Sequence, residues 1–557
     1  MNEKFLKLSS LFREKKYDEV IFLIQSSFKD KSSQVQNLLG VARLLNSKDK
    51  YSLILALSDF KQAYLKEKTT NFGLEALINF INTAVDLYTL QSPLEDTIND
   101  SSVFLNQTNV LFEEAETNFG YNKKLVSAMI RVYQNQGNLN KILSYLKKQF
   151  EKNDLNLSRF SSWIFFNNYK KNWTQDDFLK YSKLFSDKVQ DFKINKPIEL
   201  NKTKKSKIKL GFLSSEILKK HSITYFLESI FKNLNTHKFE IYLYLDNYIE
   251  DENTNEFKNL AKKSINVSNL EDIDAFNLIR EDNIDIMFDV TGMTTSKRVA
   301  LFKNRLAPKQ ISWLGYCNTS GLDNMDYLIA DRNLIYKDEE KNYSENIIYL
   351  PNIWNCHSGL NSKRSESEAP CLKEKNITFG SFNNFNKIND KVIYVWSQIL
   401  QQVKNAKLIL KSSLKMNRDY LKQEFNKHGV LDSIIFLEKR KLESHYNLYK
   451  QIDIALDTFP YNGVTTTFEA ISMGVPVITM KGYNFNSRCG ESIIKNLGID
   501  SLIANEEGDY ISKAIKLTHD RNKLSKMRKE IYNTSYQTPL FDTKKFSSDF
   551  FDILEKI

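Results

Sequence analysis

Cysteine is scarce in this sequence, with four residues in 557, and no two of them form a C-x-x-C pair. So few cysteines exclude a disulfide scaffold and make a reducing cytoplasm the expected compartment. No run approaches the ~18 consecutive apolar residues that span a bilayer, so no transmembrane segment is expected. The first residues become charged again before any long apolar stretch, so a secretory signal is not expected either.

Histidine is also rare. The six histidines show no metal-ligand spacing, so no metal site is predicted. The 79 Lys and Arg residues exceed the 68 Asp and Glu residues by 11, but they are not gathered on one stripe. Zinc-finger, RNP and basic-region patterns are absent, so no nucleic-acid partner is predicted. With 41% apolar and 26% charged residues, the composition is that of a globular chain.

The first 190 residues have the pattern of helices alone, because apolar residues recur every three or four positions. Gly40, Ala56, Phe60 and Ala63 resemble the spacing of a tetratricopeptide repeat, in which small residues allow a close helix crossing and an aromatic ring fills the gap. An ordinary helical bundle is the alternative. No His, Cys or paired acids cluster here, so residues 1–190 are predicted to be a helical scaffold or docking domain.

Residues 191–206 are polar and basic and contain a proline, which predicts a linker. Beyond them, short β-rich apolar runs alternate with helical stretches, a pattern typical of parallel sheets buried on both faces. The pattern restarts after a polar stretch, so the sequence predicts two Rossmann-like lobes, residues 207–360 and 361–557. Ligands of such sheets bind beyond the carboxyl ends of the strands, and the site is therefore expected in those loops.

One such loop follows the strand that ends at Asp457. It contains Gly463, which permits a tight turn, and a threonine run that starts the next helix. Hydroxyl groups beside unpaired N–H groups at a helix start predict an anion site that fits a diphosphate. Glu469 lies one turn inside that helix, within possible reach of a ribose. The alternatives are an ordinary threonine N-cap and a solvated helix face.

Two further side chains follow the first strand of each lobe. Lys387, in the second lobe, could neutralise charge on a departing diphosphate; the alternative is an exposed lysine without a role. His221, in the first lobe, stands at a helix start, where it could orient an acceptor hydroxyl or take its proton. The alternative is a structural histidine.

Together these loops identify a family. Residues from about 207 to 557 resemble the catalytic region of glycosyltransferase family 41, which contains protein O-linked N-acetylglucosamine transferases and SPINDLY-type protein O-fucosyltransferases. The stretches that carry the resemblance are KKHSITYFLESI, APKQISWLGYCNTSG, MDYLIAD, SENIIYLP, ITFGSFNNFNKI and HYNLYKQIDIALDTFPYNGVTTTFEAISMGVPVITM. The resemblance implies a GT-B fold after a short tetratricopeptide-like region, a nucleotide-sugar donor, no metal, and inverting transfer to Ser or Thr hydroxyls.

The resemblance also assigns roles to residues. Lys387 matches the lysine on the donor diphosphate, His221 the histidine at the sugar and acceptor end, and His445 a histidine near the nucleotide. The phosphate-binding threonine pair and the acid that holds the ribose also have counterparts. The predicted catalytic residues are thus His221 and Lys387, and the predicted donor-binding residues are Asn384, Lys387, His445, Asn462, Gly463, Thr465, Thr466, Thr467 and Glu469. Asp272-Ile273-Asp274 matches a metal-binding D-x-D, but it precedes a helical stretch and is predicted to supply first-turn acids.

Some positions depart from the family pattern. Val464 stands where the animal-type enzymes have His, Glu469 where they have Asp, and the positions that contact the base are changed to Arg440 and Leu442. UDP-N-acetylglucosamine is favoured as donor because it is the family's commonest. The alternatives are a GDP-fucose-dependent O-fucosyltransferase, an asparagine N-glucosyltransferase of the adhesin-modifying branch, a transferase acting on surface glycans, and a nucleotide-sugar-binding scaffold protein. A polypeptide acceptor is expected to dock partly on the helical domain.

Overall fold

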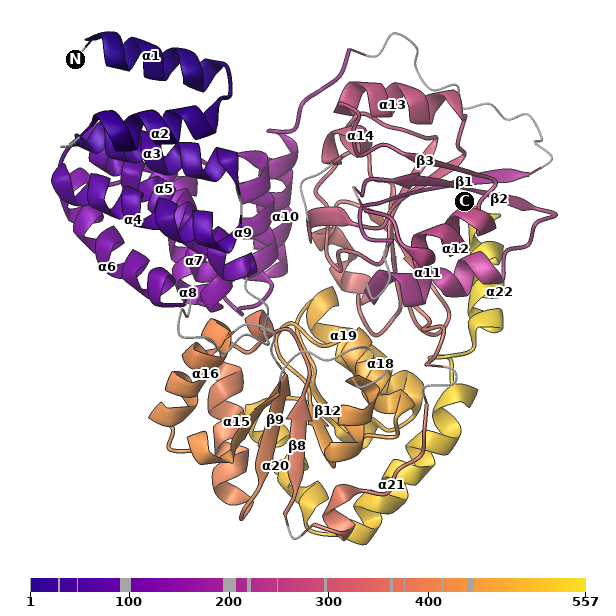
Figure 1. Cartoon of the computed structure of the whole chain (residues 1–557). Helices are drawn as coiled ribbons and strands as arrows, with labels where there is room; N and C mark the ends of the chain where they lie inside the picture. Colours follow the sequence, from indigo (N-terminus) through magenta and orange to yellow (C-terminus); the bar gives the residue numbers. More distant parts are fainter. Residues whose placement is uncertain are drawn as a thin grey trace. The chain divides into compact units, whose positions relative to one another are not determined.

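The computed structural model describes residues 2–28, 31–47, 49–90, 102–193, 207–217, 222–247, 249–294, 298–360, 364–374, 376–411, 415–437 and 445–557 (Figure 1). The chain divides into two compact units, of which the smaller holds residues 1–154 and 413–421 and the larger holds residues 155–412 and 422–557. No helix in the described ranges combines the length and the apolar character needed to cross a bilayer.

The smaller unit is helical, as its sequence pattern predicts. Its helices are α1 (Asn2–Arg13), α2 (Tyr17–Ser27), α3 (Ser33–Asn46), α4 (Lys50–Lys66), α5 (Asn71–Leu90), α6 (Ser102–Phe119), α7 (Lys123–Gln136) and α8 (Leu139–Glu151). Gly40 of α3 lies against the ring of Phe60 of α4 so closely that a Cβ at this glycine would lie 2.6 Å from the ring. Ala56, Phe60 and Ala63 are fully buried. The predicted close crossing filled by an aromatic ring is therefore confirmed.

The larger unit begins with α9 (Leu157–Asn167) and α10 (Gln175–Ser186). Side-chain amides tie this helix pair to the sheets that follow. Asn168 accepts a hydrogen bond from Asn318 at 3.2 Å and another from Asn486, and Gln175 donates to Asn318 at 2.7 Å. The predicted domain limits at residues 190, 206 and 360 stay predictions, and most of the predicted linker, residues 194–206, lies outside the described residues.

The first sheet of this unit has seven parallel strands in the order β3-β2-β1-β4-β5-β6-β7. They are β1 (Ile208–Ser214), β2 (Phe239–Leu245), β3 (Lys263–Asn266), β4 (Ile286–Asp289), β5 (Lys309–Ser312), β6 (Tyr327–Ala330) and β7 (Asn346–Tyr349). The helices between them are α11 (Ser222–Lys232), α12 (Glu252–Leu260), α13 (Asp272–Glu281) and α14 (Val299–Lys303), with short 3-10 turns η1 (Gly292–Thr294) and η2 (Lys337–Asn342). Helices lie on both faces of this sheet (Figure 1), and β1 and β2 are accordingly buried along most of their length.

The second sheet has six parallel strands in the order β10-β9-β8-β11-β12-β13. They are β8 (Thr378–Ser381), β9 (Lys407–Lys411), β10 (Ile434–Leu437), β11 (Ile454–Leu456), β12 (Val477–Met480) and β13 (Ile503–Ala504). The helices in this part of the chain are α15 (Asp390–Gln402), α16 (Lys415–Lys427), α18 (Thr465–Ser472), α19 (Phe485–Leu497), α20 (Glu507–Thr518), α21 (Arg521–Thr534) and α22 (Thr543–Leu554). The 3-10 turns are η4 (Pro370–Leu372), η5 (Phe385–Lys387), η6 (Leu431–Ser433), η7 (Asn447–Gln451), η8 (Asp500–Leu502) and η9 (Ser535–Gln537). Two Rossmann-like lobes after a helical region confirm the predicted fold class.

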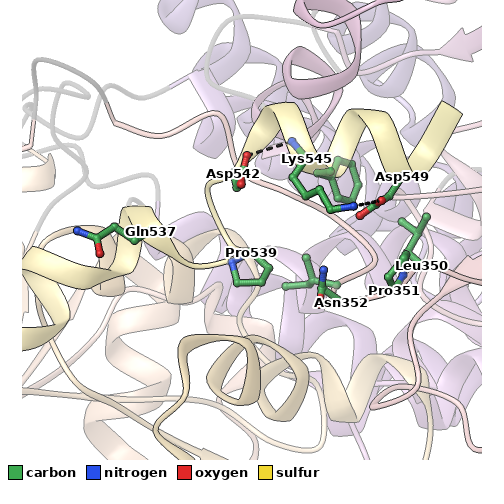
Figure 2. Close-up of a pocket in the computed structure, with 10 residues that line it drawn as sticks. Leu350, Pro351, Asn352, Gln537, Pro539, Asp542, Lys545 and Asp549 are labelled. Atoms are coloured by element: carbon green, nitrogen blue, oxygen red, sulfur yellow. Dashed lines mark hydrogen bonds and ion pairs between the residues drawn. The ribbon is translucent and has the colours of Figure 1, made fainter. Parts of the chain in front are cut away.

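The last helix, α22, packs on the first lobe. The Ser547 hydroxyl donates to the carbonyl of Ser229 on α11 at 2.7 Å, and the rings of Phe550 and Trp313 lie 4.8 Å apart. A pocket of about 100 Å³ opens between α22 and the loop after β7, lined by Pro351, Asn352, Pro539 and Lys545 among others (Figure 2). It contains none of the residues that the sequence predicts for the site.

Candidate functional site

Each sheet has one position where the strand order reverses. It lies between β1 and β4 in the first sheet and between β8 and β11 in the second. At such a position the loops leave the sheet in opposite directions and open a crevice beyond the carboxyl ends of the strands. Lys387 follows β8, and the turn of residues 458–463 follows β11. The topology therefore brings these two predicted loops together.

Lys387 ends the short turn η5 and points at the turn after β11. Its Nζ donates to the carbonyl oxygen of Asn462 at 2.8 Å and lies 4.5 Å from the centre of the Tyr461 ring. Burial lowers the pKa of Lys387 to about 8, and the nearby charge of Asp457 opposes that fall. Because this half-buried ammonium is already held in one position, ordering it when an anion binds costs little free energy. This suits it to diphosphate binding.

The turn of residues 458–463 is built around buried polar groups. The Asn462 side chain donates to Thr458 O at 2.9 Å and accepts from the N–H of Gly490 at 3.1 Å. A Cβ on Gly463 would lie 2.5 Å from Thr466 Oγ1 and 2.6 Å from Asn383 Oδ1. The glycine is thus required by the close approach of two side chains.

Helix α18 starts without a side-chain cap, since its first flanking residue is Val464. Two hydroxyls of the threonine run make hydrogen bonds within the fold, and their predicted role at the donor stays a prediction. Thr466 donates its hydroxyl to Asn383 Oδ1 at 2.9 Å, and Thr467 donates to the Gly463 carbonyl at 2.9 Å. The anion site stays a prediction; what this helix start offers to an anion is its N–H groups and the helix dipole, with Thr465 at the first helical position.

Asn383 connects the two loops, which the sequence analysis did not foresee. It is buried and accepts the Thr466 hydrogen bond, whereas Asn384 is exposed and accepts from the N–H of Asn386 at 3.0 Å. Side chains alternate between the two faces of a strand, and Ser381 and Asn383, two positions apart, are both buried. This alternation is the sequence signal that could have identified Asn383.

His445 and Glu469 form a buried cluster at the next loop. His445 Nε2 lies 3.0 Å from Glu469 Oε2, and Nδ1 lies 2.8 Å from the ammonium of Lys411. Because an ammonium only donates, the ring nitrogen facing it accepts, and Nε2 carries the hydrogen that Glu469 receives. Tyr449 donates to the same Oε2 at 2.8 Å. Burial would raise the pKa of Glu469, but these two donors hold it below its usual value.

Two carboxyl groups lie at the reversal point of the first sheet. Glu216 follows β1 and Asp289 ends β4. Burial, with the charge of Asp289 as a second cause, raises the pKa of Glu216 to about 7. Asp289 accepts the N–H groups of Thr291 and Gly292 at 3.0 and 2.9 Å. The sequence analysis missed Glu216, since an acid after a strand carries no motif until the topology places β1 beside β4.

The two lobes meet beside these loops. The hydroxyls of Tyr225 on α11 and Tyr446 lie 3.1 Å apart. The ring of His357 lies between them and α18, stacked 4.6 Å from Tyr225 and 5.6 Å from Phe468. His221, the predicted catalytic histidine, lies outside the described residues, as do Arg440 and Leu442.

The D-x-D acids lie at the start of a helix. Asp272 and Asp274 lie in the first turn of α13, as predicted, and Asp272 accepts from Arg298 at 2.7 Å. Among the residues that the structure describes, no three His, Cys, Asp or Glu side chains gather in a way that could hold a metal ion. A narrow pocket of about 10 Å³, room for about one water molecule, lies among Ser381, Asn383 and Asp457 beneath the loops.

Comparison with known families gives a match over most of the chain. A model of glycosyl transferase family 41 matches residues 133–359 and 360–550. Those ranges contain every loop described above.

Curated relatives match the lobes. A tomato protein named "Probable UDP-N-acetylglucosamine--peptide N-acetylglucosaminyltransferase SPINDLY" is 32% identical over 351 residues, which cover 61% of this chain and 37% of that protein. An Arabidopsis protein of the same name, but designated SEC, is 26% identical over 352 residues, covering 61% of this chain and 36% of its own. The chain thus spans little more than a third of the length of these relatives.

Among solved structures, an O-GlcNAc transferase mutant from Thermobaculum terrenum shares the fold, with a TM-score of 0.78 and 20% identity. The match covers 95% of this chain and 98% of that one, so the helical region and both lobes have counterparts in one molecule.

Proposed function

Because this chain belongs to glycosyl transferase family 41, we propose that it transfers a sugar from a nucleotide diphosphate donor to Ser or Thr hydroxyls of polypeptides, with inversion at the anomeric carbon. The observation that carries the proposal is the position of Lys387. Its ammonium is held by Asn462 O at the sheet reversal point, beside the uncapped start of α18.

The reaction needs positive charge where the sugar leaves the nucleotide. When the bond between the anomeric carbon and the diphosphate breaks, the electron pair remains on the diphosphate. The Lys387 ammonium and the N–H groups at the start of α18 are in place before that charge develops, and removing one such donor typically costs about 3–4 kcal/mol of barrier. We assign this role to these groups in place of a metal ion.

The nucleoside has a matching surface. Glu469 takes the hydrogen bonds of His445 and Tyr449 on Oε2, which leaves Oε1 for the ribose hydroxyls. The imidazole of His445 is fixed between Lys411 and Glu469 and so holds the Glu469 carboxylate in place. These contacts support a nucleotide donor.

The acceptor hydroxyl must lose its proton as it attacks. We propose Glu216 as the group that receives it, since a carboxyl with a pKa of about 7 is a base at neutral pH and lies at the reversal point of the opposite sheet. His221, which follows on the same loop in the sequence, is the alternative base.

We propose UDP-N-acetylglucosamine as donor, which the printed names of the relatives support, and a polypeptide acceptor that docks partly on the helical region. Four free cysteines support a reducing compartment such as the cytoplasm.

The test is a panel of donors with mass spectrometry of the products. Full-length protein is incubated with UDP-N-acetylglucosamine, UDP-glucose or GDP-fucose and a Ser/Thr-rich peptide library that also contains Asn. Transfer of N-acetylglucosamine to Ser or Thr is expected. Transfer of fucose would make GDP-fucose the donor in place of UDP-N-acetylglucosamine. Modification of Asn would make asparagine the acceptor in place of Ser or Thr. Nucleotide binding without transfer from any donor would make the chain a binding protein and refute the enzymatic proposal.

A further inference from the structure

Asp457, the residue after β11, has a buried carboxylate without a role in the proposed transfer. Its side chain accepts three hydrogen bonds. Oδ1 accepts from the N–H groups of Thr458 at 2.9 Å and Gly463 at 2.6 Å, and Oδ2 accepts from the hydroxyl of Thr479 at 2.7 Å. One carboxylate therefore ties the first residue of the turn to the last.

This arrangement connects Asp457 to Lys387 through the backbone. Asn462, whose carbonyl accepts the lysine hydrogen bond, directly precedes Gly463, whose N–H is held by Asp457. Helix α19 closes the other side, since a Cβ on Gly490 would lie 2.8 Å from Asp457 Oδ2. With strand, turn and helix packed around it, the carboxylate cannot move without moving the carbonyl that orients Lys387.

The charges of the two residues also support each other. Burial lowers the pKa of Lys387 to about 8, and the Asp457 charge raises it again. Cys489 and Cys317 also face the lysine, and burial raises the pKa of the Cys489 thiol well above its usual value, so it stays uncharged near neutral pH. Burial raises the pKa of Asp457 to about 6, opposed by its hydrogen bonds and by Lys387.

The other groups that face this pair complete its surroundings. They are the ring of Tyr461 beneath the lysine and the hydroxyl of Tyr510, which donates to the Asp457 carbonyl at 2.8 Å. Burial raises the pKa of both phenols well above the usual value, so they stay neutral. Around neutral pH, Lys387 and Asp457 are therefore the charged members of the group.

We propose that Asp457 is a positioning residue for the diphosphate: its carboxylate fixes the turn that orients Lys387 and keeps that ammonium charged until the donor arrives. This inference rests on the proposed function, because it concerns how the same site binds its donor. It separates two tasks, in that Lys387 contacts the phosphate and Asp457 acts only through Lys387 and the turn.

The test compares Asp457→Asn with Asp453→Asn. Asp453 precedes the same strand at its other end, is equally buried and also accepts two backbone N–H groups, from Cys371 at 2.8 Å and Thr378 at 2.9 Å. It therefore matches Asp457 in burial and in its two backbone hydrogen bonds, but it is not among the charges that shift the pKa of Lys387. Binding of UDP and of GDP to the full-length chain is measured by isothermal titration calorimetry from about pH 6.5 to about pH 9.

In the wild type, affinity is expected to fall as the pH rises through about 8, because Lys387 loses its proton. Asp457→Asn removes the charge that favours the ammonium, so the fall should begin about one pH unit lower. Asp457→Glu restores the charge, so the pH at which affinity falls should return toward the wild-type value. Asp453→Asn should leave that pH unchanged. Should Asp457→Asn not fold, Thr479→Val removes one hydrogen bond to the carboxylate and should move the fall in the same direction by less.

The outcomes separate the inference from the function. A folded Asp457→Asn protein whose affinity falls at the wild-type pH overturns the inference and leaves the proposed function intact. An equal displacement in Asp453→Asn also overturns it, since the effect would then be general. A wild-type protein that binds neither nucleotide overturns the proposed function, and the inference with it.

Discussion

Gly463→Ala is the substitution that most directly examines the start of α18 as the diphosphate site. The added methyl would lie 2.5 Å from Thr466 Oγ1, 2.6 Å from Asn383 Oδ1 and 3.0 Å from Asp457 Oδ1, whereas ordinary contacts begin at 3.4 Å. Two neighbours must therefore move by nearly 1 Å, and a misplacement of about 1 Å can cost ~100-fold in rate. Overpacking of this kind costs about 1–3 kcal/mol of stability, which a domain of this size tolerates.

Steady-state transfer to a peptide acceptor measures kcat, and a thermal unfolding scan reports stability. Gly508→Ala is the control, because its nearest neighbour is 3.9 Å away and it lies in α20, where alanine gains up to about 1 kcal/mol over glycine. We expect Gly463→Ala to lose ~100-fold in kcat and Gly508→Ala to lose nothing. Wild-type kcat in a folded Gly463→Ala protein would refute the assignment of the diphosphate to the start of α18.

Three further predictions follow from the same geometry. Lys387→Ala should lower kcat ~100-fold or more with the unfolding temperature unchanged; a fall smaller than about threefold would remove the lysine from the mechanism. Glu216 must be ionised to accept a proton, so kcat/KM should rise with pH through about 7, and Glu216→Gln should abolish this rise together with most of the activity. A pH profile that keeps its rise in Glu216→Gln would shift the role to another base, with His221→Ala as the next variant. Dialysis against EDTA should leave kcat unchanged, because Lys387 and the α18 N–H groups supply the positive charge; a loss restored by a divalent cation would contradict this.

Local pattern was sufficient for the fold. Strands such as Phe239–Leu245 are buried almost along their whole length, and burial on both faces demands a continuous apolar run that is visible without coordinates. The hairpin of α3 and α4 was equally predictable, because the contact of Gly40 with Phe60 requires only residues spaced at helical intervals. Each of these features depends on neighbours in sequence.

The site was only partly predictable. The loops were found because they follow strands, and Lys387 lies where a loop after β8 must lie. The hydroxyls of Thr466 and Thr467 donate hydrogen bonds within the fold, which local sequence did not indicate, and their role at a ligand stays a prediction. Asn384 was predicted to bind the donor, and its neighbour Asn383 was not. Which of the two is buried became known only from the structure, where Asn383 is buried and Asn384 is exposed.

The amino-acid sequence by itself determined the order of helices and strands, the two lobes and the family, since these follow from periodicity and from motifs that are contiguous in the chain. Tertiary structure alone decided which charges meet. Glu216 lies near Asp289, and Asp457 near Lys387, because separate strands end at one edge of a sheet. Electrostatic and hydrogen-bond energies depend on the distance between two groups and on how deeply they are buried. Each of these pairs is separated by 70 or more positions in the chain, and no local sequence pattern indicates the distance or the burial of such a pair.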